Sequence, residues 1–175
     1  MTSRSLPRLT LVLGGARSGK SSYAEQLFAQ EKAPLYIATG QAFDDEMQAR
    51  IAHHRDRRGP HWRTVEEPLD LAPALARFSA ESWPILVDCL TFWLSNLMLA
   101  ERDVGAACDE LLQTLSALPG PVVLVSNEVG FGVVPDNALA REFRDHAGRL
   151  HQRLAAEADR VLLMVAGLPL ILKGS

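Results

Sequence analysis

The sequence predicts an α/β domain with a mostly parallel β-sheet and helices on both of its faces. Short apolar runs rich in β-branched residues alternate with longer segments in which apolar residues recur at helical spacing. The first apolar run leads directly into a glycine-rich segment, and good helix formers follow. The last two apolar runs are separated by Gly167-Leu168-Pro169, which predicts a C-terminal antiparallel hairpin.

The predicted strands are short apolar runs bounded by turn residues or by the start of a helical pattern. The run Pro-Val-Val-Leu-Val-Ser, which ends at Ser126, is the clearest because β-branched residues dominate it. The run that ends at Asp88 closes with a carboxylate, and the run after His61 is short and partly polar, as in an edge strand. In chain order, the predicted strands are residues 9–13, 35–39, 62–65, 84–88, 121–126, 160–165 and 170–172.

The predicted helices gather their apolar residues on one face. The longest has apolar residues spaced by threes and fours from Leu139 to Ala158. Pro73 lies early in its helix, where a missing backbone N–H is tolerated, and Gly59-Pro60 ends a strongly charged helix. In chain order, the predicted helices are residues 22–30, 44–58, 69–79, 91–99, 104–118 and 138–158.

Size and composition indicate one globular domain over residues 1–175. A hydrophobic content of 47% supports a sizeable core, and a net charge of −3 argues against nucleic acid as the main partner. Two cysteines are too few for a disulfide framework or a zinc site, which fits a reducing cytosol, and both are interpreted as small buried residues. No run approaches the ~20 apolar residues of a membrane span, and residues 1–8 lack a signal core, so we expect a cytoplasmic protein.

The glycine-rich segment fits the phosphate-binding pattern G-x-x-x-x-G-K-[ST], in the strand–loop–helix context that this pattern requires. Backbone N–H groups of such a loop surround an anion, and the helix start adds partial positive charge. Lys20 would reach the β- and γ-phosphates of a nucleotide, and the Ser21 hydroxyl would ligate Mg²⁺. The alternative is a glycine-rich turn with a solvated lysine. The predicted phosphate-binding residues are Gly14, Gly15, Ala16, Arg17, Ser18, Gly19, Lys20 and Ser21.

Other candidate residues follow from the rule that ligands bind beyond the carboxyl ends of parallel strands. This rule nominates residues 39–41, 88–91 and 126–128 beside the glycine loop. Asp88 has the form of a Walker-B carboxylate that holds Mg²⁺, and Glu128 competes for that role. The alternative for either residue is a helix N-cap or a loop salt bridge.

The charged helix predicted at residues 44–58 carries acids in its first turn, arginines in its last turn and two adjacent histidines. His53 and His54 point about 100° apart on a helix, so they are poorly placed to share a metal ion. Arg50 and Arg57 neighbour the face of His53, and nearby cations lower the pKa of an imidazole. A neutral imidazole beside guanidinium groups suits nucleophilic attack on phosphorus. The alternative is an exposed basic helix end.

The chain resembles the bifunctional adenosylcobinamide kinase / adenosylcobinamide-phosphate guanylyltransferase family. The resemblance rests on residues 14–21, 36–39, 44–54, 61–64, 125–130 and 134–145, and the P-loop joined to the double histidine and to Asn-Glu-Val-Gly is its most specific part. It implies a RecA-like P-loop NTPase fold, a homotrimer and two reactions. ATP or GTP phosphorylates adenosylcobinamide, and GTP then donates GMP to adenosylcobinamide phosphate. The GMP passes through a histidine intermediate, which the resemblance assigns to His53.

The resemblance also implies which residues meet GTP, and this sequence departs from the family pattern at two of them. Asp88 stands where the family pattern has the longer glutamate, and Gly40 stands where that pattern has a serine. Two rival functions are a monofunctional P-loop kinase for a small molecule and a nucleotide-dependent switch or ATPase. The implied GTP-binding residues outside the P-loop are Thr39, Gly40, Gln41, His54, Arg55, Asp56, Arg57, Glu66 and Asp88.

Overall fold

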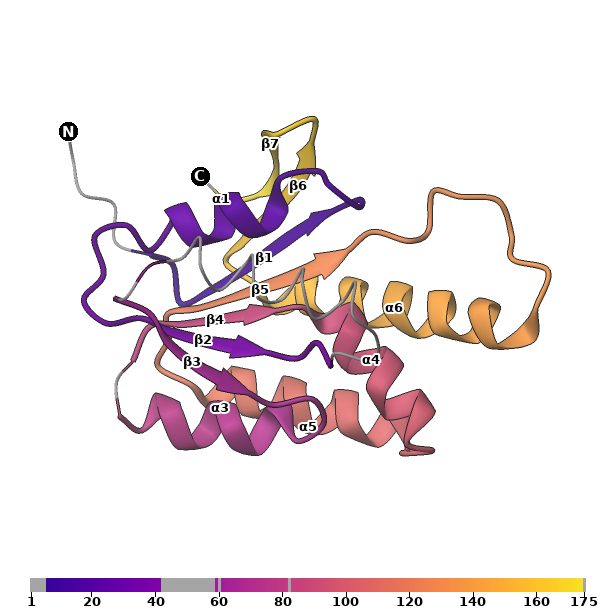
Figure 1. The fold of residues 1–175 in the computed structure, drawn as a ribbon, viewed down its shortest axis with the longest axis horizontal. Coiled ribbons are helices and arrows are strands. Elements are labelled where there is room, and N and C mark those ends of the chain that lie inside the picture. The colour runs from indigo at the N-terminus through magenta and orange to yellow at the C-terminus, as the bar shows by residue number, and fades with distance from the viewer. Residues whose placement is uncertain (1–5, 42–58, 60, 82, 175) are drawn as a thin grey trace.

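The computed structural model describes residues 6–41, 59, 61–81 and 83–174. Among these residues, seven strands form one sheet in the order β3-β2-β4-β5-β1-β6-β7, and every neighbouring pair except β6 and β7 is parallel (Figure 1). The predicted mostly parallel sheet, its edge strand β3 and its C-terminal hairpin are therefore confirmed. The strands are β1 Leu9–Gly14, β2 Leu35–Ala38, β3 Arg63–Glu66, β4 Ile85–Asp88, β5 Val122–Asn127, β6 Arg160–Val165 and β7 Leu168–Lys173.

Helices cover both faces of the sheet, as predicted, but unequally in the described part of the chain. Helix α1 lies on one face, where Phe28 just beyond its end packs with Val12 of β1; the other four helices share the opposite core with Leu11 (Figure 1). Neighbouring residues of β1 thus enter opposite cores, which is the two-residue period of a strand. The helices are α1 Lys20–Gln26, α3 Leu71–Ser79, α4 Leu90–Leu99, α5 Val104–Ala117 and α6 Ala138–Glu157. The helix predicted at residues 44–58 lies outside the described residues.

Most elements begin or end one or two residues from the predicted bounds, and helix α1 and the C-terminal hairpin differ in ways that matter for the fold. Helix α1 begins two residues earlier than expected and ends at Gln26, after which the chain runs in turns. The C-terminal hairpin turns at Ala166-Gly167, whose φ angles of 51° and 80° suit a tight two-residue turn, so Pro169 lies within β7 opposite Met164. Strand β7 is an edge strand, where proline costs little because no further strand needs its N–H.

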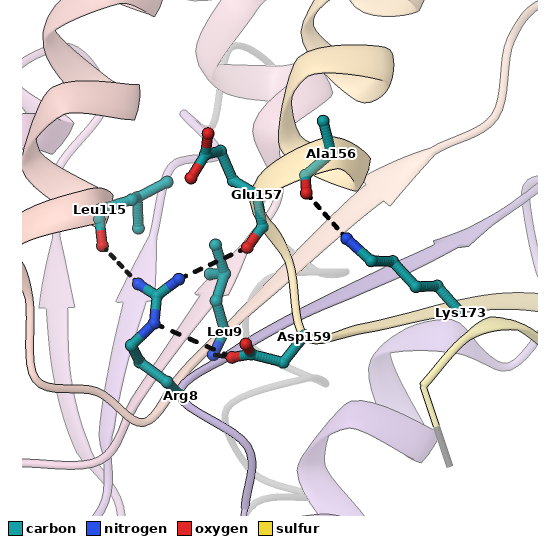
Figure 2. A network of polar contacts seen from close by, with 7 residues as sticks. All are labelled: Arg8, Leu9, Leu115, Ala156, Glu157, Asp159 and Lys173. Atoms are coloured by element: carbon teal, nitrogen blue, oxygen red, sulfur yellow. Dashed lines mark hydrogen bonds and ion pairs between the residues drawn. The ribbon is translucent and has the colours of Figure 1, made fainter.

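The end of the sheet where the parallel strands begin is held by charged side chains that bind backbone groups (Figure 2). Arg8 donates to the carbonyl oxygen of Leu115 at 2.9 Å, and Asp159 accepts from the N–H of Leu9 at 2.9 Å. Lys173 donates to the carbonyl oxygens of Ala155 and Ala156, in the last turn of α6, at 3.0 and 2.7 Å. These carbonyls have no partner inside the helix, so the lysine completes its C-terminus. We call this group of contacts the amino-end network.

Candidate functional site

A cleft of about 750 Å³ opens at the other end of the sheet, where the parallel strands finish. It lies between the glycine-rich loop and the first turn of α1 on one side and the carboxyl ends of β2, β4 and β5 on the other. The starts of α4 and α6 close it. The residues that line it are Ala16, Arg17, Ser18, Gly19, Lys20, Ser21, Ser22, Tyr36, Ala38, Gly40, Asp88, Cys89, Thr91, Phe92, Ser95, Asn127, Glu128, Val129 and Phe143.

Two glycines of the loop meet steric requirements that other residues would not. A Cβ at Gly14 would lie 2.5 Å from Ser18 Oγ and 2.9 Å from the carbonyl oxygen of Met164. Gly19 has a φ of +91°, a conformation that favours glycine, and a Cβ there would lie 3.3 Å from the Cα of Gly167 in the hairpin turn. The N–H of Gly167 also donates to the carbonyl oxygen of Ser18 at 3.0 Å. The β6–β7 turn therefore supports the loop from behind.

Lys20 and Ser18 give the loop the features of an anion site. Lys20 is only 8% exposed, and its Nζ donates to the carbonyl oxygen of Gly15 at 3.1 Å, which holds the side chain across its own loop. Ser18 Oγ is buried and has no hydrogen-bond partner among the described residues. A buried polar atom of this kind is costly unless a ligand completes it. The loop thus presents a cation at one end of the cleft, and the Ser18 hydroxyl lies buried beneath it near Gly14.

Asp88 ends β4 and does not cap the following helix. The N-cap of α4 is Cys89, with no side-chain capping bond, so the capping alternative for Asp88 is wrong. Instead, Asp88 Oδ2 accepts a hydrogen bond from the hydroxyl of Tyr36 at 2.9 Å. Tyr36 comes from the neighbouring strand β2, and the bond fixes the carboxylate where it lines the cleft.

Thr39 has a structural position beside Asp88. Its hydroxyl donates to the carbonyl oxygen of Cys89 at 2.7 Å and accepts from the N–H of Cys89 at 2.9 Å, and its side chain is fully buried. Asn96 of α4 donates to the carbonyl oxygen of Thr39 at 2.7 Å. These bonds fix the turn that carries Asp88, so Thr39 supports the cleft without lining it.

Glu128 reaches the cleft from the loop after β5. Its Oε1 accepts from the N–H of Gly130, and its Oε2 lies 3.9 Å from Nδ1 of His151 on α6. The other ring nitrogen of His151, Nε2, lies 2.7 Å from Ser126 Oγ. Burial lowers the pKa of His151, although the Glu128 carboxylate acts in the opposite direction.

The structure places the predicted site residues in three groups. The loop residues 16–21, Gly40 and Asp88 line the cleft. Glu66 is exposed at the end of the edge strand β3, with β2 between it and β4. The residues that do not line the cleft are Gly14, Gly15, Thr39, Gln41 and Glu66. The candidates His53, His54, Arg55, Asp56 and Arg57 lie outside the described residues.

Two residues of the site were not predicted, although each had a signal in the sequence: Tyr36 lines the cleft, and His151 lies behind Glu128. Tyr36 is the one hydroxyl group in the apolar run of β2. His151 stands four residues after Ala147 and three before Leu154, on the buried face of α6, where a histidine interrupts an apolar stripe. Asn127, which donates to Thr91 Oγ1 at 2.8 Å, lies in the nominated segment 126–128 and lines the cleft.

The donor set of the cleft suits a hard cation better than a soft one. Ser21 and Asp88 offer oxygen atoms, which Mg²⁺ prefers. Cys89 is buried, and desolvation followed by the Asp88 charge raises its pKa to about 11, so it stays a thiol. Burial likewise raises the pKa of Cys108 to about 11, and both cysteines are buried as predicted. The described residues contain no group of three His, Cys, Asp or Glu side chains suited to a metal ion.

Comparison with known proteins shows one family to which the chain is similar over most of its length. Residues 10–172 match the model described as CobU, cobinamide kinase / cobinamide phosphate guanyltransferase. The chain is 53% identical over 167 residues to the bifunctional adenosylcobalamin biosynthesis protein CobP of Pseudomonas aeruginosa, covering 94% of this chain and 96% of that protein. It is 47% identical over 180 residues to the corresponding CobU of Salmonella typhimurium, covering 94% and 99%, and 42% identical to that of Escherichia coli.

Solved structures with little sequence identity share the fold. An ATPase from the type III secretion system of pathogenic bacteria aligns with a TM-score of 0.55 at 10% identity, over 90% of this chain and 51% of that one. A protein of Pyrococcus horikoshii OT3 aligns with a TM-score of 0.55 at 9% identity, over 98% and 88%. The likeness shows the P-loop NTPase fold and nothing of the activity.

Proposed function

The chain belongs to the family of cobinamide kinases / cobinamide phosphate guanyltransferases, and we propose that both of its reactions use the one cleft at the carboxyl end of the sheet. It is a bifunctional enzyme of adenosylcobalamin biosynthesis. The observation that carries the proposal is that Lys20 of the loop and Asp88 of β4 line the same cleft, although 68 positions separate them (88 − 20). A triphosphate bound on the loop would present its phosphorus atoms to both.

In the kinase reaction, ATP or GTP gives its γ-phosphoryl group to the hydroxyl of adenosylcobinamide. Backbone N–H groups of residues 16–21 and the Lys20 ammonium would hold the β- and γ-phosphates. Ser21 and Asp88 would hold Mg²⁺, which when bound neutralises charge on the phosphates. Tyr36 keeps the Asp88 carboxylate turned toward that position.

In the guanylyltransferase reaction, a ring nitrogen of His53 attacks the α-phosphorus of GTP, and pyrophosphate leaves. The phosphate oxygen of adenosylcobinamide phosphate then attacks the same phosphorus, which releases His53 and gives adenosylcobinamide-GDP. Arg50 and Arg57, three and four residues from His53, would neutralise charge at the α-phosphate. The proposed further GTP contacts are Thr39, Gly40, Gln41, His54, Arg55, Asp56, Arg57 and Glu66.

A homotrimer fits the exposed apolar surface of the C-terminal hairpin. Leu168 is 71% exposed, although no helix of the sequence indicated such a surface. Exposed apolar residues in one hairpin are typical of a subunit interface. They are Val165, Leu168, Leu170, Ile171 and Leu172.

In the described part of the chain, no helix is both long and apolar enough to cross a membrane. We propose a cytoplasmic enzyme.

The test is covalent labelling with α-labelled GTP and Mg²⁺, followed by denaturation. We expect label that survives alkali but not acid, as a phosphoramidate does, and that is lost in His53→Ala. The neighbouring variant His54→Ala is the matched control and should retain the label. Label retained by His53→Ala would remove that residue from the nucleophile role. No label on the parent protein would favour a monofunctional kinase or a nucleotide-dependent switch.

A further inference from the structure

Three polar side chains near the cleft form a chain that the two reactions above do not use. Ser126, at the end of β5, is completely buried, and its Oγ lies 2.7 Å from His151 Nε2. His151 is 7% exposed, and its Nδ1 lies 3.9 Å from Glu128 Oε2. Glu128 lines the cleft. A hydroxyl, an imidazole and a carboxylate thus lead from the core to the nucleotide site.

The exposure of the three side chains decides which of them can act on a substrate. A serine, a histidine and an acid in this sequence of contacts also occur in hydrolases, where the serine attacks the substrate. Here the serine has no exposed surface and the carboxylate faces the cleft. The geometry therefore excludes Ser126 as a nucleophile. Glu128 is the member of the three that can contact a substrate in the cleft.

The proton positions follow from the donors and acceptors available. Burial keeps His151 neutral by lowering its pKa, and a neutral imidazole carries one N–H. An ionised carboxylate only accepts, so the proton belongs on Nδ1, and Nε2 then accepts from the Ser126 hydroxyl. At 3.9 Å the contact between Nδ1 and Oε2 is longer than a hydrogen bond, and the imidazole N–H interacts with the carboxylate through its dipole.

Glu128 is held from a second side as well. The backbone N–H of Gly130 donates to Oε1, so the two carboxylate oxygens face different donors. Asp88, the other carboxylate of the cleft, already accepts from Tyr36 and ends β4, which β5 separates from the strand that leads into the phosphate loop. The two carboxylates therefore have separate surroundings, which suits separate tasks.

We infer that Glu128 takes the proton of the acceptor hydroxyl in the kinase reaction and that His151 is the positioning residue that holds this carboxylate in place. As the hydroxyl oxygen bonds to the γ-phosphorus, its O–H bond breaks and the proton moves to Glu128. The bond from the γ-phosphorus to the bridging oxygen breaks, and the nucleoside diphosphate leaves with that electron pair. The inference rests on the proposed nucleotide site.

The second reaction of the same enzyme provides an internal control. Its acceptor is the phosphate group of adenosylcobinamide phosphate, which has no hydroxyl proton to give up at neutral pH. Weakening the base should therefore lower the kinase rate more than the guanylyltransferase rate. A residue that only stabilises the fold would lower both in proportion to the folded protein that remains.

The experiment measures kcat and KM of both reactions, with cobinamide and its phosphate as acceptors, together with the melting temperature. Glu128→Gln should lower the kinase kcat about 100-fold or more, as loss of a general base does. His151→Gln, which keeps an amide near Nε2 but none near Nδ1, should lower it about tenfold with KM for cobinamide little changed. His151→Asn, which keeps an amide N–H near Nδ1, should restore most of that loss. His146→Gln is the matched control, because His146 lies on the same helix against Glu142 at the surface.

The double variant of Glu128→Gln and His151→Gln should be no slower than Glu128→Gln alone, since His151 acts through Glu128. A kinase kcat of Glu128→Gln within about threefold of the parent would overturn the inference. So would equal losses in both reactions for His151→Gln, or a double variant with multiplied losses. If His151→Gln does not fold, the kinase rates of Glu128→Gln and His151→Asn still test the inference. An inactive parent or an active Lys20→Ala would instead contradict the proposed function.

Discussion

The charged groups at the two ends of the sheet have different roles. In the amino-end network, Arg8, Asp159 and Lys173 each bind backbone groups of neighbouring elements (Figure 2). At the carboxyl end, Lys20 and Asp88 line a cleft of about 750 Å³. The charged groups at the amino end stabilise the fold, whereas those at the carboxyl end face the cleft.

This difference has a measurable consequence, because substitutions at the two ends should separate stability from activity. Loss of an amino-end contact leaves a backbone group without its partner, which lowers the free energy of unfolding. Loss of a cleft side chain removes a contact that exists in full only when nucleotide is bound, which lowers turnover.

Lys20→Ala should have the largest effect on turnover. The ammonium is expected to neutralise charge on the transferring phosphates, and loss of a comparable electrostatic donor costs about 2.7–4 kcal/mol of transition-state stabilisation. We expect both kcat values to fall about 100- to 1000-fold, measured by steady-state assays of each reaction. Near-normal turnover in both would contradict the phosphate-binding role of the loop.

Gly14→Ala should distort the loop through overpacking. The added Cβ would meet Ser18 Oγ at 2.5 Å and the Met164 carbonyl oxygen at 2.9 Å, and overpacking of this kind costs about 1–3 kcal/mol. Chemical denaturation measures the change in the free energy of unfolding. Gly15→Ala is the matched control for stability, because a Cβ there meets no atom within 4 Å. Equal stability of the two variants would show that the loop has room at Gly14.

Asp159→Ala should lower stability and leave turnover alone. The variant removes the acceptor of the Leu9 N–H and one partner of Arg8, so we expect a loss of about 1–2 kcal/mol in the free energy of unfolding. Both kcat values should match those of the parent. Asp109→Ala removes an exposed ion pair with Arg153 and should cost no more than about 0.5 kcal/mol. A large drop in kcat for Asp159→Ala would mean that the two ends are coupled.

Stability should also fall in mild acid because of His151. Its pKa in the folded protein lies below the ordinary value of 6.5, so the unfolded chain binds a proton first as the pH falls. The free energy of unfolding therefore decreases as the pH drops through 6.5 toward the folded pKa. Denaturation at about pH 7.5 and about pH 5.5 measures the decrease, and His151→Asn should reduce it. If the parent protein instead became more stable as the pH fell from about 7.5 to about 5.5, the burial of a neutral imidazole would be contradicted.

The sequence predicted most of the sheet because its signals are local. The strand at residues 122–127 follows from a run of β-branched residues, and the loop at Gly14 follows from a pattern that contains its own flanks. The hairpin was also predicted, but Pro169 was placed in the turn. Its real position depends on β7 being an edge strand, which only the assembled sheet reveals.

The contacts within the site were less predictable because their partners are distant in the chain. Tyr36 binds Asp88 across 52 positions, and Thr39 binds Cys89 across 50, so neither role follows from local pattern. The sequence left both Asp88 and Glu128 open as the site carboxylate. Their contacts distinguish them, since His151 approaches Glu128 and Tyr36 binds Asp88. The role of His53 stays a prediction.

The most direct measurement of the central claim is a crystal structure of the protein with Mg²⁺ and a non-hydrolysable GTP analogue. We expect the β- and γ-phosphates within about 3.2 Å of Lys20 Nζ and of backbone N–H groups in the glycine loop, with the α-phosphate turned toward His53. A triphosphate bound elsewhere, with the loop empty, would contradict it.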